Sequence, residues 1–330
     1  MNANTTLTCC FLLLLSVQPR LQSQNFRNAE AYLSDFGKNE RYITESLVAY
    51  SSSLINGEKE SRTHATVQTI YKKLQNINAI VTRNDKGFEG DTSLRDTFLK
   101  MNHATLVLLD DNTLKLDDYE AQRHLSFDEI FNDFDLRKRN IINYYSLIVD
   151  YTNAKRRFSR RNDVKQDRYF SNRDIFEYNS HQSLIFFKIN VLDAKLSDLL
   201  STTDEASVTK CIAYLDQISE ESLVQIDDYT KVNVDQSLNL ATQALIHFVQ
   251  QRNELILPLY KDYVASLSNF SNTDKASASD DVREKLGELE KQLNVAKTKL
   301  DEQLALAQTK KKALVDKWIE TERSLLQNKL

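Results

Sequence analysis

Residues 88–119 read FEGDTSLRDTFLKMNHATLVLLDDNTLKLDDY, and this stretch decides the fold because the second half of the chain repeats it. Each copy starts at an aspartate and continues as a helix-forming sequence. The repeat therefore predicts two modules of similar construction. Shifted by 144 positions, Asp91, Ser93, Leu94, His103, Asp118 and Tyr119 correspond to Asp235, Ser237, Leu238, His247, Asp262 and Tyr263.

The first copy has the periodicity of an amphipathic helix. Apolar side chains recur every three or four residues, which places them on one face. Asp91 or Thr92 would cap the start of this helix, since a side-chain oxygen there can accept from an unpaired amide of the first turn. The same periodicity predicts the other helices over residues 28–55, 60–81, 126–158, 173–200, 204–229 and 235–267, followed by a long helix from about residue 280.

The composition favours an all-α fold. Only five glycines and two prolines occur in 330 residues. Turns draw on both residue types, so their scarcity indicates long helices with few connections. We expect a tandem of two up-down-up-down four-helix bundles that arose by internal duplication. The modules would cover residues 24–161 and 173–330, joined by a polar linker at 162–172, and the last helix keeps a coiled-coil heptad spacing.

The N-terminus has the pattern of a secretory leader. Residues 11–15 read FLLLL, an apolar run shorter than the roughly 20 residues that cross a bilayer. Such a run fits the middle of a signal peptide, here residues 1–23, although no Lys or Arg precedes it. Later apolar runs are also too short to span a membrane. We therefore expect an exported protein at the cell surface, in the periplasm or outside the cell.

The charge balance argues against nucleic acid as a partner. The chain has 43 basic and 47 acidic residues, and removal of Arg20 with the leader leaves 42 basic residues and a net charge of −5. Nucleic-acid-binding domains are usually strongly basic. One basic set, Lys155, Arg156, Arg157, Arg160 and Arg161, suits the negative end of the fourth helix. Contact of these arginines with an anionic lipid or polysaccharide is the alternative reading.

Four short segments of the first module resemble a known family. In order, they read NAEAY at 28–32, GDTSLRD at 90–96, DDYE at 117–120 and SFDEI at 126–130. This order is similar to that of the LIC-type surface-protein family, an uncharacterised group of exported bacterial proteins first named from spirochaete genomes. The resemblance covers about residues 28–160, and Phe127 and Ile130 stand where the family pattern has Tyr and Met. It implies an exported helical surface protein and no particular activity.

Metal chemistry finds little support in the sequence. A di-metal site in a four-helix bundle needs Glu-x-x-His on two helices, and this motif does not occur. The pairs Glu60/His64, Glu120/His124 and Glu177/His181 are spaced by four and are predicted to be surface pairs. His103 and His247 lie about half a turn from the apolar stripe and should point away from the core. We expect no metal and no cofactor.

The remaining polar motifs favour structure and binding over catalysis. Arg95 and Asp96 could form a polar anchor under a loop from Gly87 to Gly90, and Cys211 is predicted to be buried and unreactive. The leading hypothesis is a non-catalytic binding or scaffold protein. The alternative is an enzyme with a carboxylate-lined pocket between the modules, in which Asp118 or Asp128 is the general acid or base. The candidate interaction or structural residues are Gly90, Asp91, Arg95, Asp96, Asp118, Tyr119 and Asp128.

Overall fold

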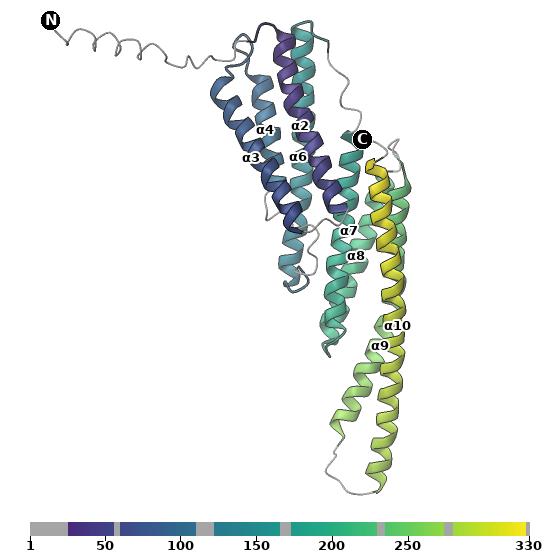
Figure 1. Cartoon of the computed structure of the whole chain (residues 1–330). Coiled ribbons are helices and arrows are strands. Elements are labelled where there is room, and N and C mark those ends of the chain that lie inside the picture. The colour runs from purple at the N-terminus through teal and green to yellow at the C-terminus, as the bar shows by residue number, and fades with distance from the viewer. Residues whose placement is uncertain are drawn as a thin grey trace, which may run out of the picture. The chain divides into compact units, whose positions relative to one another are not determined.

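The described part of the chain is helical, which confirms the all-α prediction (Figure 1). The structure is a computed structural model, and it describes residues 26–55, 60–109, 122–165, 173–229, 235–273 and 280–327. Within these ranges the only β-type pairing is an isolated bridge between Phe88 and Asp91. Among the described helices, none combines the length and the apolar character needed to cross a membrane.

Contacts between helices divide the chain into two compact units. Unit 1 contains α2 (Ala29–Ile55) as far as Ser51, α3 (Glu60–Asn84), α4 (Ser93–Leu108) and the second half of α6 (Phe127–Arg161). Unit 2 contains the first half of α6, then α7 (Arg173–Leu199), α8 (Glu205–Tyr229), α9 (Ser237–Asn272) and α10 (Asp280–Gln327). The finer expectation of two up-down-up-down four-helix bundles stays a prediction.

Aromatic rings from three helices fill the core of unit 1. On α2, Tyr32 packs edge-on against Phe36, with ring centroids 5.1 Å apart. Phe36 in turn meets Phe98 of α4 at 5.0 Å, and Phe98 lies 5.7 Å from Tyr151 of α6. The predicted stripe of the third helix is buried over the described residues, at Leu94, Phe98, Met101, Thr105 and Leu109. The rest of that stripe, Leu116 and Tyr119, lies outside the described residues.

The core of unit 2 includes the first half of α6. Ile130 and Phe134 of this helix are buried in the same apolar cluster as Ile189 of α7 and Leu215 of α8. The division between the units therefore falls inside α6, between Ile142 and Asn143. The expected change of module lay later, at residues 162–172. The difference arises because α6 buries apolar side chains along most of its 35 residues, first in one core and then in the other.

The last two helices of unit 2 extend beyond its core. Tyr260 on α9 and Leu300 on α10 are buried, but no residue of 261–273 or 281–299 is. We call these two segments the arm. In Figure 1 α9 and α10 continue together past the ends of α7 and α8. The predicted heptad positions of α10 within the arm are half-buried: Val282, Leu286, Leu289, Leu293 and Ala296.

Candidate interaction site

The loop before α4, which the repeat singled out, is held to the core of unit 1 by Asp85. This carboxylate is 3% exposed and accepts a hydrogen bond from the Tyr32 hydroxyl at 3.0 Å. The backbone amide of Gly87 donates to the same carboxylate at 2.7 Å, and the Arg95 guanidinium donates to the Asp85 carbonyl at 2.8 Å. Burial and the neighbouring Asp85 carboxylate raise the pKa of Tyr32 far above its ordinary value. Tyr32 is therefore a neutral hydrogen-bond donor.

Two glycines shape this loop. Gly87 and Gly90 have φ angles of +86° and +85°, a region that L-residues with a Cβ rarely adopt. A Cβ on Gly87 would lie 2.5 Å from the Asp91 carbonyl oxygen, whereas one on Gly90 would meet no atom within 4 Å. Phe88, between them, packs against Tyr32 and Phe158 with centroids 5.7 and 5.6 Å away. The loop is therefore closed onto the aromatic core.

Asp91 accepts from an amide of the first helical turn, as the sequence predicted, although Thr92 occupies the N-cap position and makes no side-chain capping hydrogen bond. One oxygen of Asp91 accepts from the Ser93 amide at 2.9 Å, and the other forms an ion pair with Arg161. These interactions, the Ser93 amide first, lower the pKa of Asp91. Arg95 binds Asp96 at 2.7 Å, which makes the predicted polar anchor a short ion pair tied to the loop through Asp85.

The second copy of the motif repeats the helix start. Asp235 accepts from the Ser237 amide at 2.8 Å, as Asp91 does from Ser93. Leu94 and Leu238 are both fully buried, and His103 and His247 are both exposed as predicted. The adjacent contacts differ, since the amide of Asn239 donates to the buried hydroxyl of Tyr178 at 2.9 Å. The repeated residues therefore have a local structural role in both units.

A buried ion pair crosses the core of unit 1. Lys155 of α6 donates to Glu40 of α2 at 2.7 and 2.9 Å, and each side chain is 8% exposed. Burial raises the pKa of Glu40 and lowers that of Lys155, so desolvation outweighs their mutual attraction. Lys155 is therefore buried, unlike the four arginines of the basic set at the end of α6. The other members, Arg156, Arg157, Arg160 and Arg161, are exposed, and Arg161 binds Asp91.

A larger ionic cluster connects the helices of unit 2. Asp193 of α7 is 3% exposed and forms ion pairs with Arg252 of α9 and Lys311 of α10. Arg252 also donates to Asn253 at 2.8 Å, and Asn253 reaches Asp216 of α8 at 3.3 Å. Burial opposes the charged form of Asp193, but the two cations outweigh it and hold the pKa below its ordinary value of 3.8. The cluster therefore stays charged and bonded across four helices.

Sequence reasoning missed both buried acids, although a signal was present. Glu40 follows Phe36 by four residues and precedes Ile43 by three, so it lies on the apolar stripe of α2. Asp193 has the same relation to Ile189 and Leu196 on α7. An acid at a stripe position predicts a buried charge, and a buried charge needs a partner. The partners lie far away in sequence, which is why periodicity alone does not identify them.

Other chemically reactive side chains are engaged in structural contacts. Cys211 is fully buried as predicted, its thiol donates to the Leu192 carbonyl, and burial raises its pKa to about 12. His181 was predicted at the surface, but it is buried within 3.3 Å of Gln225, and burial lowers its pKa. The surface prediction is wrong for His181, because α7 packs against α8 there and brings the ring to Gln225. In the described ranges, no group of three His, Cys, Asp or Glu side chains is placed to hold a metal ion.

The last predicted candidates are separated. Asp128 is exposed in the first turn of α6, which begins with the predicted capping box: the Ser126 amide donates to Glu129 at 2.8 Å. Asp118 and Tyr119 lie outside the described residues. The structure therefore brings Gly90, Asp91, Arg95 and Asp96 together at one loop, and it assigns Asp128 no described partner in that loop.

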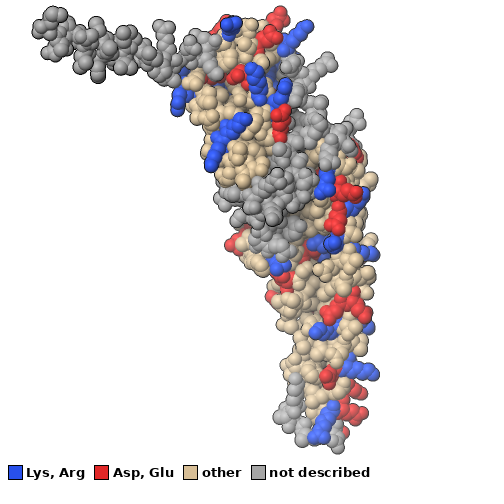
Figure 2. All heavy atoms as spheres, viewed as in Figure 1, with Lys and Arg blue, Asp and Glu red and all other residues tan. Residues whose placement is uncertain are grey.

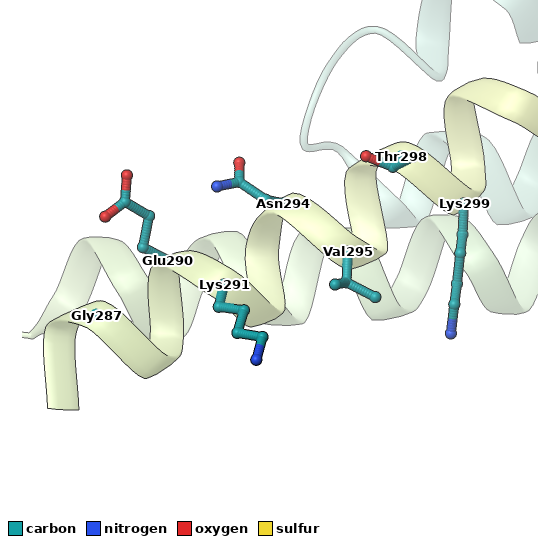
Figure 3. A pocket seen from close by; sticks show the side chains of 7 residues that line it. All are labelled: Gly287, Glu290, Lys291, Asn294, Val295, Thr298 and Lys299. Atoms are coloured by element: carbon teal, nitrogen blue, oxygen red, sulfur yellow. The ribbon is translucent and has the colours of Figure 1, made fainter. Parts of the chain in front are cut away.

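Two grooves on the described surface of unit 2 lie along α10. One has a volume of about 520 Å³ and is lined by α10 alone; Figure 3 shows Lys291, Val295 and Lys299 on one side of the helix and Glu290 and Asn294 on the other. The second, of about 440 Å³, lies between α9 and α10 beside Pro258 and Lys299. Both are lined by residues of the arm or next to it.

Comparison with family models, with curated proteins and with solved structures finds no match to this chain.

Proposed function

We propose that this chain is a non-catalytic helical binding or scaffold protein. Its buried charges connect helices, its repeated aspartates cap helices, and its thiol is buried with a raised pKa. These groups stabilise the fold, and each is already satisfied by a partner inside its own unit. We also propose the finer architecture of two four-helix modules, which would act as rigid supports for helix surfaces.

The observation that carries the binding function is the incomplete burial of the arm. Apolar side chains of both helices meet along it, yet all of them keep contact with solvent: Tyr263, Val264, Leu267 and Phe270 on α9, and Val282, Leu286, Leu289 and Leu293 on α10. A helix pair buries its apolar faces well only when further helices cover it. An apolar surface that stays partly exposed is typical of an interaction site.

Export to the cell surface, periplasm or exterior is part of the same proposal. It is supported by the leader-like residues 1–23 and by the resemblance of residues 28–160 to the LIC-type family. Mass analysis of the product in the producing cell should find a chain that begins at Gln24. An uncleaved chain retained in the cytoplasm would contradict export and leave the binding function open to its own test.

Site-specific photo-crosslinking in the producing cells tests the binding function. A photoreactive residue at Gln292, which is exposed on the arm beside Leu289 and Ala296, should give adducts of higher mass. The control is Val224 on α8, which is 70% exposed but lies outside the arm. Equal adduct yields at the two positions, or none at Gln292, would contradict a binding role for the arm.

A further inference from the structure

We propose that the arm is the docking surface for a second copy of this chain, with the two arms side by side and antiparallel. This inference rests on the proposed binding function and specifies its partner. It is carried by two features of the arm: an apolar seam that lacks a covering layer, and opposite net charges on the two halves of its α10 segment, residues 281–290 and 291–299.

The apolar seam needs two more helices to be covered. On α10 it runs from Val282 to Ala296, and on α9 it includes Leu267 and Phe270, beyond Tyr263 and Val264, which pack against the core; every member is half-buried. A second arm supplies two helices with the same seam, which together make a four-helix arrangement. The copy is therefore a partner of matching length and matching apolar spacing.

The charges on α10 select an antiparallel orientation. Its tip half, residues 281–290, carries Asp281, Glu284, Glu288 and Glu290 against two basic residues, a net charge of −2. Its base half, residues 291–299, carries Lys291, Lys297 and Lys299 and no acid, a net charge of +3. Lys261 and Asp262 cancel on α9. Figure 2 shows charged side chains of both signs along the arm.

Antiparallel arms place each acidic half against a basic half, whereas parallel arms would align like charges. An antiparallel pair has a two-fold axis, so each surface meets itself with the direction reversed. The axis would lie near Glu290 and Lys291, where the charge changes sign. Electrostatic complementarity of this kind fixes the register and suppresses the wrong orientation.

The expected dimer is weak. The nineteen α10 residues of the arm extend about 28 Å, and two helix diameters give a face of roughly 560 Å². Stable interfaces bury about 800 Å² per partner. We therefore expect dimerisation with a Kd in the micromolar range. Sedimentation velocity of the full chain from about 1 to 200 µM covers this range.

Charge reversal tests the orientation. One variant reverses the tip (Glu284→Lys, Glu288→Lys, Glu290→Lys), a second reverses the base (Lys291→Glu, Lys297→Glu, Lys299→Glu), and a third combines them. All six side chains are exposed, so circular dichroism should show unchanged helix content. Each single-half variant should weaken dimerisation at least tenfold, and the combined variant should restore it. The control is Lys310→Glu with Lys312→Glu, two exposed α10 residues beyond the arm, which should leave the dimer unchanged.

Mixing adds an independent measurement, because the tip-reversed and base-reversed chains are monomeric alone but should form a heterodimer together. A wild-type chain that stays monomeric up to 200 µM, or a dimer equally strong in all variants, overturns the inference. If arm crosslinks form in cells to a different protein while the purified chain is monomeric, the binding function stands and self-association fails.

Discussion

The two units answer the same problem, a buried acid on an apolar stripe, in different ways. In unit 1 Glu40 faces a single cation, Lys155. The desolvation of both groups outweighs their attraction, so the pKa of Glu40 is raised and that of Lys155 is lowered. In unit 2 Asp193 faces both Arg252 and Lys311. Attraction to the two cations outweighs desolvation, so the pKa of Asp193 is lowered. The comparison teaches that a second cation can reverse the direction in which a buried site shifts the pKa of an acid.

Removal of the acids should separate the two cases most strongly. Asp193→Asn leaves Arg252 and Lys311, whose side chains are 10% and 22% exposed, without a carboxylate and should destabilise unit 2 by about 3–5 kcal/mol. Glu40→Gln should cost less, because it leaves one cation without a carboxylate rather than two. Urea unfolding followed by hydrogen exchange in each unit measures both costs. A larger loss from Glu40→Gln would contradict the comparison.

Substitutions on α6 should show that one helix serves two cores. Phe134 is buried in unit 2 and Phe158 in unit 1, so Phe134→Ala and Phe158→Ala should each cost about 3–5 kcal/mol. Hydrogen exchange should increase first in unit 2 for the former and in unit 1 for the latter. Equal protection loss in both units from either change would mean that they unfold as one.

Alanine substitutions at the two glycines of the loop in unit 1 should differ in their cost to stability. Gly90→Ala costs about 1–2 kcal/mol for the left-handed backbone alone. Gly87→Ala should cost more, because its Cβ also meets the Asp91 carbonyl oxygen at 2.5 Å. Thermal unfolding of the two variants gives the order, and a smaller effect at Gly87 would contradict the loop geometry.

Acid titration should sharpen the contrast between the buried acids. Since the folded pKa of Asp193 is lowered, its contribution to stability is full above its ordinary 3.8 and is lost as pH falls through the folded value. Since the folded pKa of Glu40 is raised above 4.5, its contribution grows as pH falls towards 4.5. The stability of the wild type minus that of Glu40→Gln should therefore rise on acidification to pH 4.5. The stability of the wild type minus that of Asp193→Asn should stay constant as pH falls to about 3.8 and should then decrease.

The smallest effects belong to the repeated caps. Asp91→Ala and Asp235→Ala each remove an acceptor from a serine amide and should cost about 1 kcal/mol. Asp91→Ala should cost slightly more, since it also breaks the pair with Arg161, and added salt should reduce that excess. Equal losses that are insensitive to salt would show that the Arg161 pair contributes nothing.

Much of the fold could be predicted from the sequence, because helices depend on local periodicity. The start of α4 at the Asp91 motif, the capping box at Ser126 and the exposure of His103 all follow from residues within one or two turns. The site was predicted only in part. The bond from Arg95 to the Asp85 carbonyl joins residues ten apart, across a loop whose path Gly87 and Gly90 determine.

By itself, the sequence determined that the described part of the chain is all-α and where its helices begin. Only the tertiary structure decided that α6 contributes to two cores, that Lys155 meets Glu40, and that Arg252 and Lys311 meet Asp193. The physical reason is the distance along the chain over which each interaction acts. Helix periodicity and caps act over a few residues, whereas the partner of a buried charge is chosen by packing between helices more than fifty residues apart.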